Sequence, residues 1–139
     1  CLAVDLPPLI TILGKLYPAI QIEADFPHDL ILPQDRDDML ELIGNLLDNG
    51  CKYGVSKVCL TIEASADRSI IRVLDDGKGL PQESIEHLLQ RGQRLDERLD
   101  GAGLGLSICN DIIDSYQGQF AFANHPPQGI LVTIELPLR

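Results

Sequence analysis

One strong helical pattern runs from Asp35 to about Gly54. Its apolar residues recur at the spacing that places side chains on one face of an α-helix. They are Met39, Leu40, Leu42, Ile43, Leu46 and Leu47. So broad an apolar face has to be covered by a second layer of structure, and the rest of the chain must supply that layer.

Shorter helices are predicted elsewhere in the chain. A first helix is predicted over 9–17, directly after two prolines, because its apolar residues recur at helical spacing. A short helix is predicted over 82–90. Another is predicted from about 104 to 116, with Gly118 as its C-terminal cap.

Segments that alternate apolar and polar residues predict the strands. They cover 20–24, 29–32, 58–64, 69–74, 120–124 and 130–136. The third and fourth are expected to pair as a hairpin, and so are the last two. This order predicts an α+β fold with a mixed, mostly antiparallel sheet and helices on one face. A dinucleotide-binding fold is a poor match, because Gly77-x-Gly79 lacks the third glycine at the right place and is not followed at once by a long helix.

Length and composition limit the classes of function. The 139 residues fit one domain spanning 1–139. The net charge of −10 argues against a nucleic-acid surface, which needs clustered basic residues. The apolar runs are far shorter than the ~20 residues needed to cross a bilayer, so no direct membrane contact is expected. Because the chain begins at Cys1 without a methionine, it is expected to be a fragment of a larger protein.

The four cysteines, at positions 1, 51, 59 and 109, carry no metal-site pattern. None is spaced as Cys-x-x-Cys and none has a nearby histidine. Reduced thiols are therefore expected, in place of a zinc site or a disulfide framework.

The long helix also carries a polar stripe. Glu41, Asn45 and Asn49 recur every four residues and Lys52 follows three later, so their side chains share one face. A solvated surface explains Glu and Lys, but explains two helical Asn residues less well. Amide oxygens suit a hard cation such as Mg²⁺, and a lysine can hold a phosphate.

Two glycine-containing segments are further candidates for a binding site. Asp75-Asp76-Gly77-Lys78-Gly79 follows a strand and suits either a simple turn or a carboxylate that accepts a hydrogen bond from an exocyclic amine. Gly101-Ala-Gly-Leu-Gly105 opens a helix, where exposed N–H groups and the helix dipole favour a phosphate. Three arginines in the preceding loop, at 91, 94 and 98, add positive charge, although a solvated loop explains any one of them.

Together these segments resemble the N, G1 and G2 boxes of histidine kinase catalytic domains, in that order. The segments are Asn45-Leu-Leu-Asp-Asn49-Gly-Cys-Lys52-Tyr53, Asp75-x-Gly77-x-Gly79 and Gly101-x-Gly103-x-Gly105-Leu106. Asp35 is similar to the aspartate that commonly starts the family's long helix. Arg91-Gly-Gln-Arg94 and the short lid resemble the PhoQ branch. Gly50 stands where the family usually has alanine, and the F box is not evident around 88–91.

The resemblance implies a Bergerat-type α/β sandwich that binds ATP and Mg²⁺ between the long helix and a lid. Asn45 would ligate Mg²⁺, and Asn49 would contact the metal and the phosphates. Lys52 would bind a phosphate, and Tyr53 would pack on the adenine. Asp75 would accept a hydrogen bond from the adenine amine.

The remaining roles are implied in the same way. Gly77 and Gly79 would shape the adenine pocket. The G2 box, made of Gly101, Gly103, Gly105 and Leu106, would hinge the lid and cradle the phosphates. Arg94, ahead of Arg98, would contact the γ-phosphate. Glu41 would orient the metal shell or a nucleophile.

The implied reaction is transfer of the γ-phosphoryl group of ATP to a histidine. None of the three histidines, His28, His87 and His125, fits the acceptor, which in the family lies on a separate dimerisation domain. The implied partners are that domain, in a homodimer, and a response regulator. The implied location is the cytoplasmic part of a bacterial inner-membrane sensor.

Two alternatives stay open. The first is another ATPase or serine kinase of the wider gyrase and Hsp90 superfamily, because an acid at Glu41 could activate water. The second is a degenerate nucleotide-sensing or docking module without activity. The intact Asn45, Lys52 and Asp75 argue against this second alternative.

Overall fold

The computed structural model describes residues 2–77, 102–124 and 129–137. Its elements in chain order are α1 (Leu2–Leu16), β1 (Gln21–Asp25), α2 (Arg36–Tyr53), β2 (Lys57–Ala64), β3 (Arg68–Asp75), α4 (Ala102–Ser115), β4 (Gln119–Asn124) and β5 (Ile130–Pro137). The short helix predicted over 82–90 lies outside the described residues.

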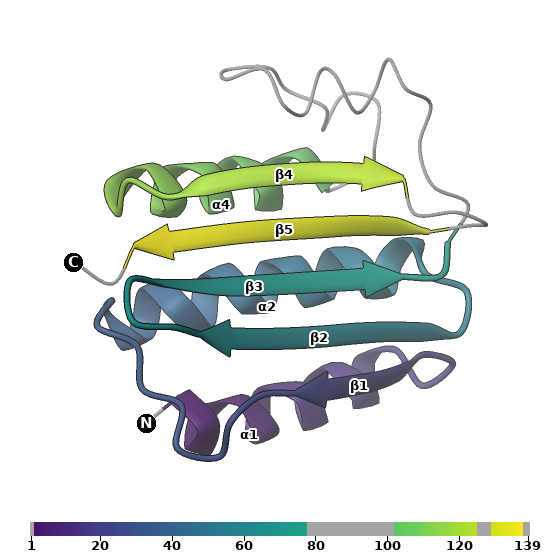
Figure 1. The fold of residues 1–139 in the computed structure, drawn as a ribbon. Coiled ribbons are helices and arrows are strands. Elements are labelled where there is room, and N and C mark those ends of the chain that lie inside the picture. The colour runs from purple at the N-terminus through teal and green to yellow at the C-terminus, as the bar shows by residue number, and fades with distance from the viewer. Residues whose placement is uncertain (1, 78–101, 125–128, 138–139) are drawn as a thin grey trace.

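The strands form one five-stranded sheet in the order β1-β2-β3-β5-β4. The β1–β2 pair is parallel and the other three pairs are antiparallel. The helices α1, α2 and α4 of the described residues lie on one face of this sheet (Figure 1). The predicted α+β fold, with a mixed and mostly antiparallel sheet and helices on one face, is therefore confirmed.

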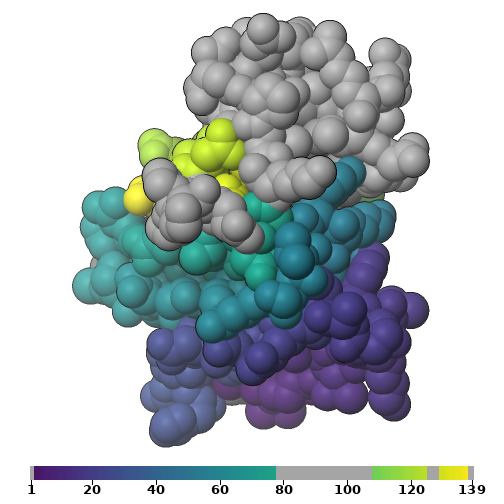
Figure 2. Space-filling view, turned by 90° about the vertical axis from the view of Figure 1, so that its right-hand side faces the viewer, coloured from purple at the N-terminus to yellow at the C-terminus, as the bar shows by residue number. Residues whose placement is uncertain are grey.

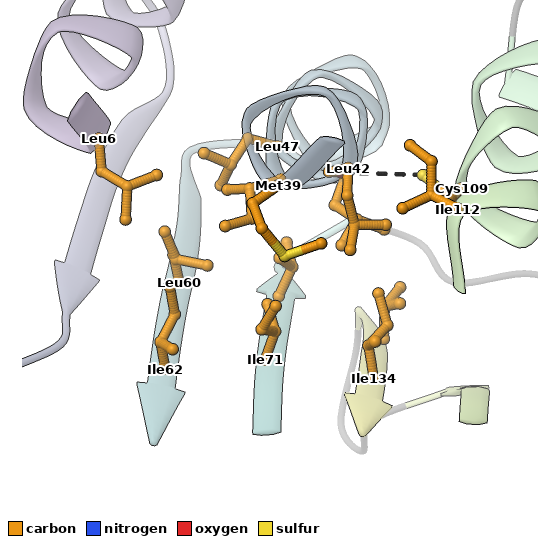
Figure 3. Packing of buried hydrophobic residues seen from close by; sticks show 14 of the residues in the cluster. Leu6, Met39, Leu42, Leu47, Leu60, Ile62, Ile71, Cys109, Ile112 and Ile134 are labelled. Atoms are coloured by element: carbon orange, nitrogen blue, oxygen red, sulfur yellow. Dashed lines mark hydrogen bonds between the residues drawn. The ribbon is translucent and has the colours of Figure 1, made fainter. Parts of the chain in front are cut away.

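The apolar face of α2 forms the centre of the core. Met39, Leu42 and Leu47 point from this helix toward the sheet, where Leu60 of β2 and Ile71 of β3 point back at them (Figure 3). All five are almost completely buried. Full burial of a large apolar side chain stabilises a fold by about 1.5–3 kcal/mol, so this contact holds the polar face of α2 in place.

The other two helices flank α2. Leu6 of α1 packs over the β1–β2 side of the sheet, and α4 packs on the opposite side of α2 (Figure 3). The Cys109 sulfur of α4 lies 3.8 Å from the carbonyl oxygen of Leu42. In the side view, α1 and β1 form one end of the molecule, with β2 and β3 above them (Figure 2). The strand order puts β4 at the opposite edge of the sheet from β1.

The first helix begins earlier than predicted. The helix α1 starts at Leu2, and Pro7 and Pro8 lie inside it. Both prolines are exposed, so water can reach the carbonyls that lose their intrahelical partner. The additional residues 2–8, about two turns, include Leu2 and Leu6, which are buried at 6% and 0% exposure. That burial offsets the cost of placing two prolines inside a helix. From the local sequence alone, the prolines predict the start of the helix.

The short strand predicted over 29–32 is wrong. This segment is irregular, and it leads from β1 to the start of α2. Leu30 is buried, and its carbonyl accepts a hydrogen bond from the N–H of Leu2. Leu30 and Leu32 therefore cover the end of the core without pairing to another strand, whereas Ile31 between them is exposed.

The residue that caps α4 is also different from the one predicted. Gln117, not Gly118, adopts the left-handed conformation, with φ of 59°. The N–H of Gln117 donates to Asp114 O, and that of Gly118 donates to Ile113 O, which is the Schellman pattern. Gly118 is needed for space, because a Cβ there would lie 2.7 Å from the Glu135 carbonyl oxygen.

Candidate functional site

The polar stripe of α2 lies as predicted, beside its apolar face. Asp35 caps the helix: its side chain accepts a hydrogen bond from the Asp38 N–H. Asn45 and Asn49 are half-buried, and no hydrogen bond joins either side chain to another residue in the described ranges. Their amide oxygens are therefore available to a ligand. Glu41, one turn earlier, is exposed.

Lys52 continues this stripe and has a charged partner. Its Nζ atom lies 3.3 Å from Asp48 Oδ2, one helical turn earlier. The other oxygen of Asp48 accepts a hydrogen bond of 2.6 Å from the Tyr17 hydroxyl. Asp48 thus connects a residue just after α1 with the lysine predicted to bind a phosphate.

The end of α2 and the end of β3 meet at close range. The α2 helix stops at Tyr53, and the N–H of Gly54 donates to the Gly50 carbonyl. The backbone of Gly77 then passes so close to Tyr53 that a Cβ on residue 77 would lie 2.0 Å from the Tyr53 carbonyl oxygen. The predicted adenine-contacting residues Tyr53 and Gly77 are therefore neighbours in space.

Asp75 is the last residue of β3 and the only buried acidic group in the described part of the chain, at 8% exposure. Its Oδ1 atom accepts a hydrogen bond of 2.8 Å from the Gly77 N–H. Burial raises the pKa of Asp75, although hydrogen bonds from the N–H groups of Gly77 and Ile130 oppose that rise. A desolvated carboxylate held by two backbone donors is a rigid acceptor for a ligand N–H.

The start of β5 closes one side of Asp75. Gly129 has φ of 111°, and a Cβ there would lie 1.9 Å from the Asp75 carbonyl oxygen. Only glycine fits a positive φ and so close a backbone contact without strain. Gly129 belongs to this site through its backbone, a role that sequence reasoning missed.

Asp76 stabilises the same region through hydrogen bonds that the sequence did not predict. Its carboxylate accepts hydrogen bonds from the Val55, Ser56 and Lys57 N–H groups and from the Ser56 hydroxyl. Burial raises the pKa of Asp76, but the hydrogen bonds from Ser56, Lys57 and Val55 outweigh it and hold the pKa well below its usual value. Asp76 therefore ties the turn after α2 to the end of β3, beside Asp75.

The G2 glycines lie at the start of α4. This helix begins at Ala102, two residues before the predicted start, so Gly103, Gly105 and Leu106 are part of its first two turns. That helix packs against α2. Burial raises the pKa of the Cys109 thiol to about 12, with a further contribution from the charge of Glu41.

Several predicted positions lie outside the described residues. They are Gly79, Arg94, Arg98 and Gly101 of the predicted site, and the histidines His87 and His125. The third histidine, His28, is exposed in a turn after β1. Cys51, Cys59 and Cys109 are free thiols.

The donor chemistry fits the metal that the resemblance implies. Within the described ranges, no group of three or more His, Cys, Asp or Glu side chains could hold a metal ion by itself. Mg²⁺ is commonly held by one or two protein oxygens together with substrate phosphates and water. The free amide oxygens of Asn45 and Asn49 match that limited role.

Sequence signals for the missed residues are weak. Asp48 precedes Lys52 by four residues, the spacing of a helical ion pair, but nothing in the sequence points to Tyr17 as its second partner. Asp76 and Gly129 look like ordinary turn residues.

In the described part of the chain, no helix is long and apolar enough to cross a membrane.

Comparisons with known proteins agree with this arrangement. Residues 34–139 match the model of the "Histidine kinase-, DNA gyrase B-, and HSP90-like ATPase" family. The chain is 41% identical over 138 residues to the sensor protein kinase CarS of Pseudomonas aeruginosa, which covers 99% of this chain and 31% of CarS. It is 34% identical over 113 residues to the virulence sensor histidine kinase PhoQ of Salmonella typhimurium, with 80% of this chain and 23% of PhoQ covered.

A solved structure supports the fold. The mycobacterial sensor histidine kinase MprB superposes with a TM-score of 0.77 at 20% identity, covering 96% of this chain and 95% of that one. At that identity the likeness concerns the fold. The chain spans less than a third of the length of CarS and of PhoQ.

Proposed function

The chain belongs to the histidine kinase-, DNA gyrase B- and HSP90-like ATPase family, and on that premise we propose that it is the ATP-binding catalytic domain of a sensor histidine kinase. The relatives CarS and PhoQ, matched over 99% and 80% of this chain, are sensor kinases by name. Nucleotide binding is the property expected of the family itself. The choice of ATP, of the metal and of the acceptor is the proposed part.

The environment of Asp75 carries the proposal. Its carboxylate is buried at the end of β3, fixed by the Gly77 and Ile130 N–H groups, and close to the end of α2. An acceptor held in this way discriminates an adenine, whose exocyclic amine donates, from a guanine, which presents a carbonyl at the same ring position. A buried acceptor left without its donor is costly, which makes that discrimination strong.

The phosphate side of the site follows from α2 and α4. Asn45 and Asn49 would hold Mg²⁺, which neutralises phosphate charge, and Lys52 would contact a phosphate. The N–H groups at the start of α4, around Gly103 and Gly105, would face the phosphates, where the helix dipole favours negative charge. A lid with Arg94 and Arg98 would complete the contacts.

The proposed reaction is γ-phosphoryl transfer to a histidine on a separate dimerisation domain. Such a transfer depends on positioning and on charge stabilisation more than on covalent chemistry by the protein. Within this chain, Glu41 would orient the nucleophile or the metal shell. His28 is exposed in a turn at the other end of α2, so an acceptor from elsewhere suits the geometry better.

The wider setting is part of the proposal too. The partners would be the chain's own dimerisation domain, in a homodimer, and a response regulator. The domain would lie on the cytoplasmic side of a bacterial inner-membrane sensor. Direct membrane contact by this domain is not part of the proposal.

Calorimetric titration with ATP tests the proposal. Binding is expected to require adenine, so GTP should bind at least about tenfold more weakly, and Mg²⁺ should strengthen ATP binding. Phosphotransfer from bound ATP to a separately prepared dimerisation domain of a relative such as CarS then tests the reaction. Absence of ATP binding with Mg²⁺ present would reject the proposal. ATP hydrolysis without histidine phosphorylation would instead favour another ATPase of the family.

A further inference from the structure

Asp48 lies between two partners on different elements. One carboxylate oxygen accepts the Tyr17 hydroxyl hydrogen bond of 2.6 Å, and the other lies 3.3 Å from Lys52 Nζ. Tyr17 directly follows α1, whereas Asp48 and Lys52 are both on α2. The proposed ATP site has no use for Asp48, and a carboxylate beside a phosphate site is unfavourable on charge grounds alone.

We propose that Asp48 is a specificity-determining residue that competes with the nucleotide phosphates for Lys52. This inference rests on the proposed function, because it takes Lys52 as a phosphate ligand. In the structure, Lys52 is paired with Asp48. A bound ligand must bring enough negative charge near Lys52 to replace or share that pairing.

Helix geometry places Lys52 within reach of both partners. At about 100° per residue, Asp48 and Asn49 point about 100° apart around α2. Lys52 lies one turn further on, at an angle between them. A flexible lysine in that position can turn toward Asp48 on the α1 side or toward Asn49 on the proposed phosphate side.

Tyr17 prevents Asp48 from simply moving away. Burial raises the pKa of Tyr17 to about 12, and its hydrogen bond to Asp48 adds to the rise. The hydroxyl therefore stays protonated at neutral pH and donates to Asp48. The carboxylate is held in place by a neutral donor, so its charge remains directed at Lys52.

The ion pair between Lys52 and Asp48 is weak enough for a phosphate to replace Asp48 as the partner of Lys52. The side chains of Lys52 and Asp48 are 37% and 36% exposed. Exposed pairs of this kind are weak, so a triphosphate can displace one. A ligand without phosphates gains nothing from Lys52 and leaves the pair intact. Asp48 therefore lowers affinity for a triphosphate while leaving the nucleoside unaffected.

The test compares ATP with adenosine in calorimetric titrations of wild type and Asp48→Asn. Asparagine keeps the size of the side chain and can still accept the Tyr17 hydrogen bond. The variant is expected to bind ATP about three- to tenfold more tightly, as removal of one nearby negative charge implies, with adenosine affinity unchanged. Asp29→Asn, at an exposed position in a turn, is the matched control for the change in net charge and should leave ATP affinity unchanged.

A second background tests whether the effect acts through Lys52. In Lys52→Met, which has no ammonium group to compete for, adding Asp48→Asn should change ATP affinity by less than about twofold. Three results would overturn the inference. The first is a gain in ATP affinity that persists in the Lys52→Met background, and the second is an equal gain for ATP and adenosine. The third is an Asp48→Asn protein that binds ATP no more tightly than wild type. Absence of ATP binding by wild type would instead reject the proposed function, and the inference with it.

Discussion

The backbone of Gly77 lies against the carbonyl oxygen of Tyr53, so closely that a Cβ on residue 77 would be 2.0 Å from that oxygen. Tyr53 is the last residue of α2 and Gly77 is two residues past β3. The contact joins the end of the long helix to the segment that follows Asp75. The shape of the proposed adenine pocket therefore depends on the absence of a side chain at residue 77.

Gly77→Ala is expected to separate these two segments. The new methyl would meet backbone, which cannot turn aside, so a loss of about 1–3 kcal/mol in the free energy of unfolding is expected, with ATP binding at least tenfold weaker. Chemical denaturation and calorimetry measure the two effects. Gly14→Ala is the control for ATP affinity, because nothing lies within 4 Å of a Cβ added there. Since Gly14 is inside α1, its replacement should itself stabilise the fold by up to about 1 kcal/mol. Normal ATP affinity in Gly77→Ala would contradict the proposed pocket.

Asp75→Asn is expected to weaken ATP binding selectively. The amide oxygen is a poorer acceptor than the carboxylate, and the NH₂ group would face the Gly77 or Ile130 N–H or the adenine amine. A loss of about 1–3 kcal/mol, tenfold or more in affinity, follows for ATP. GTP, which does not use this acceptor, should lose little. Unchanged ATP affinity would remove Asp75 from the adenine site.

Asp76→Asn is expected to destabilise the fold in a pH-dependent way. The pKa of Asp76 in the folded protein is below its usual 3.8, so its ionised form stabilises the fold above that pH, and the contribution is lost as pH falls toward the folded-state pKa. At pH 7 the variant should lose about 1–2 kcal/mol. The gap to wild type should narrow as denaturation is repeated below pH 4.

A gap that stays constant from pH 7 to pH 3 would show that the charge of Asp76 is not what holds the turn. Asp29→Asn again serves as the control, since Asp29 is exposed and has no hydrogen bond or ion pair among the described residues.

Asn45→Asp is expected to alter metal dependence and leave the fold intact. Because no hydrogen bond joins the Asn45 side chain to another described residue, stability should change by less than about 0.5 kcal/mol. The added charge should change how strongly Mg²⁺ promotes ATP binding, measured as the ratio of affinities with and without the ion. Asn110→Asp, a half-buried position on α4, is the control. An unaltered ratio would argue against Asn45 as a metal ligand.

Gly44→Ala is expected to stabilise the protein. Gly44 lies inside α2, where glycine costs about 1 kcal/mol relative to alanine. A Cβ there would meet only the Leu9 methyl groups, at an ordinary contact distance of 3.7 Å. Denaturation should show a gain of up to about 1 kcal/mol. Gly50→Ala should gain less, because its Cβ would lie 3.2 Å from Val58 Cγ1.

Local patterns were enough for the regular parts of the fold. The face of α2, the cap at Asp35 and both hairpins depend on neighbours within a few residues, and their spacing is visible in the chain. The start of α1 was wrong because burial of Leu2 and Leu6 by distant residues outweighed the local signal of the two prolines. The prediction for 29–32 was wrong for a related reason: Leu30 and Leu32 cover the core without pairing as a strand.

The sequence by itself determined which residues could form a nucleotide site. The spacing of Asn45, Asn49 and Lys52 places their side chains on one helix face, and Asp75-x-Gly77 directly follows a strand. Only the tertiary structure decided how that site is supported. Asp48 meets Tyr17 from 31 residues away, and Asp76 reaches back 20 residues to Ser56. Such contacts depend on how helices and strands pack against each other, and packing is a property of the whole core rather than of any local segment.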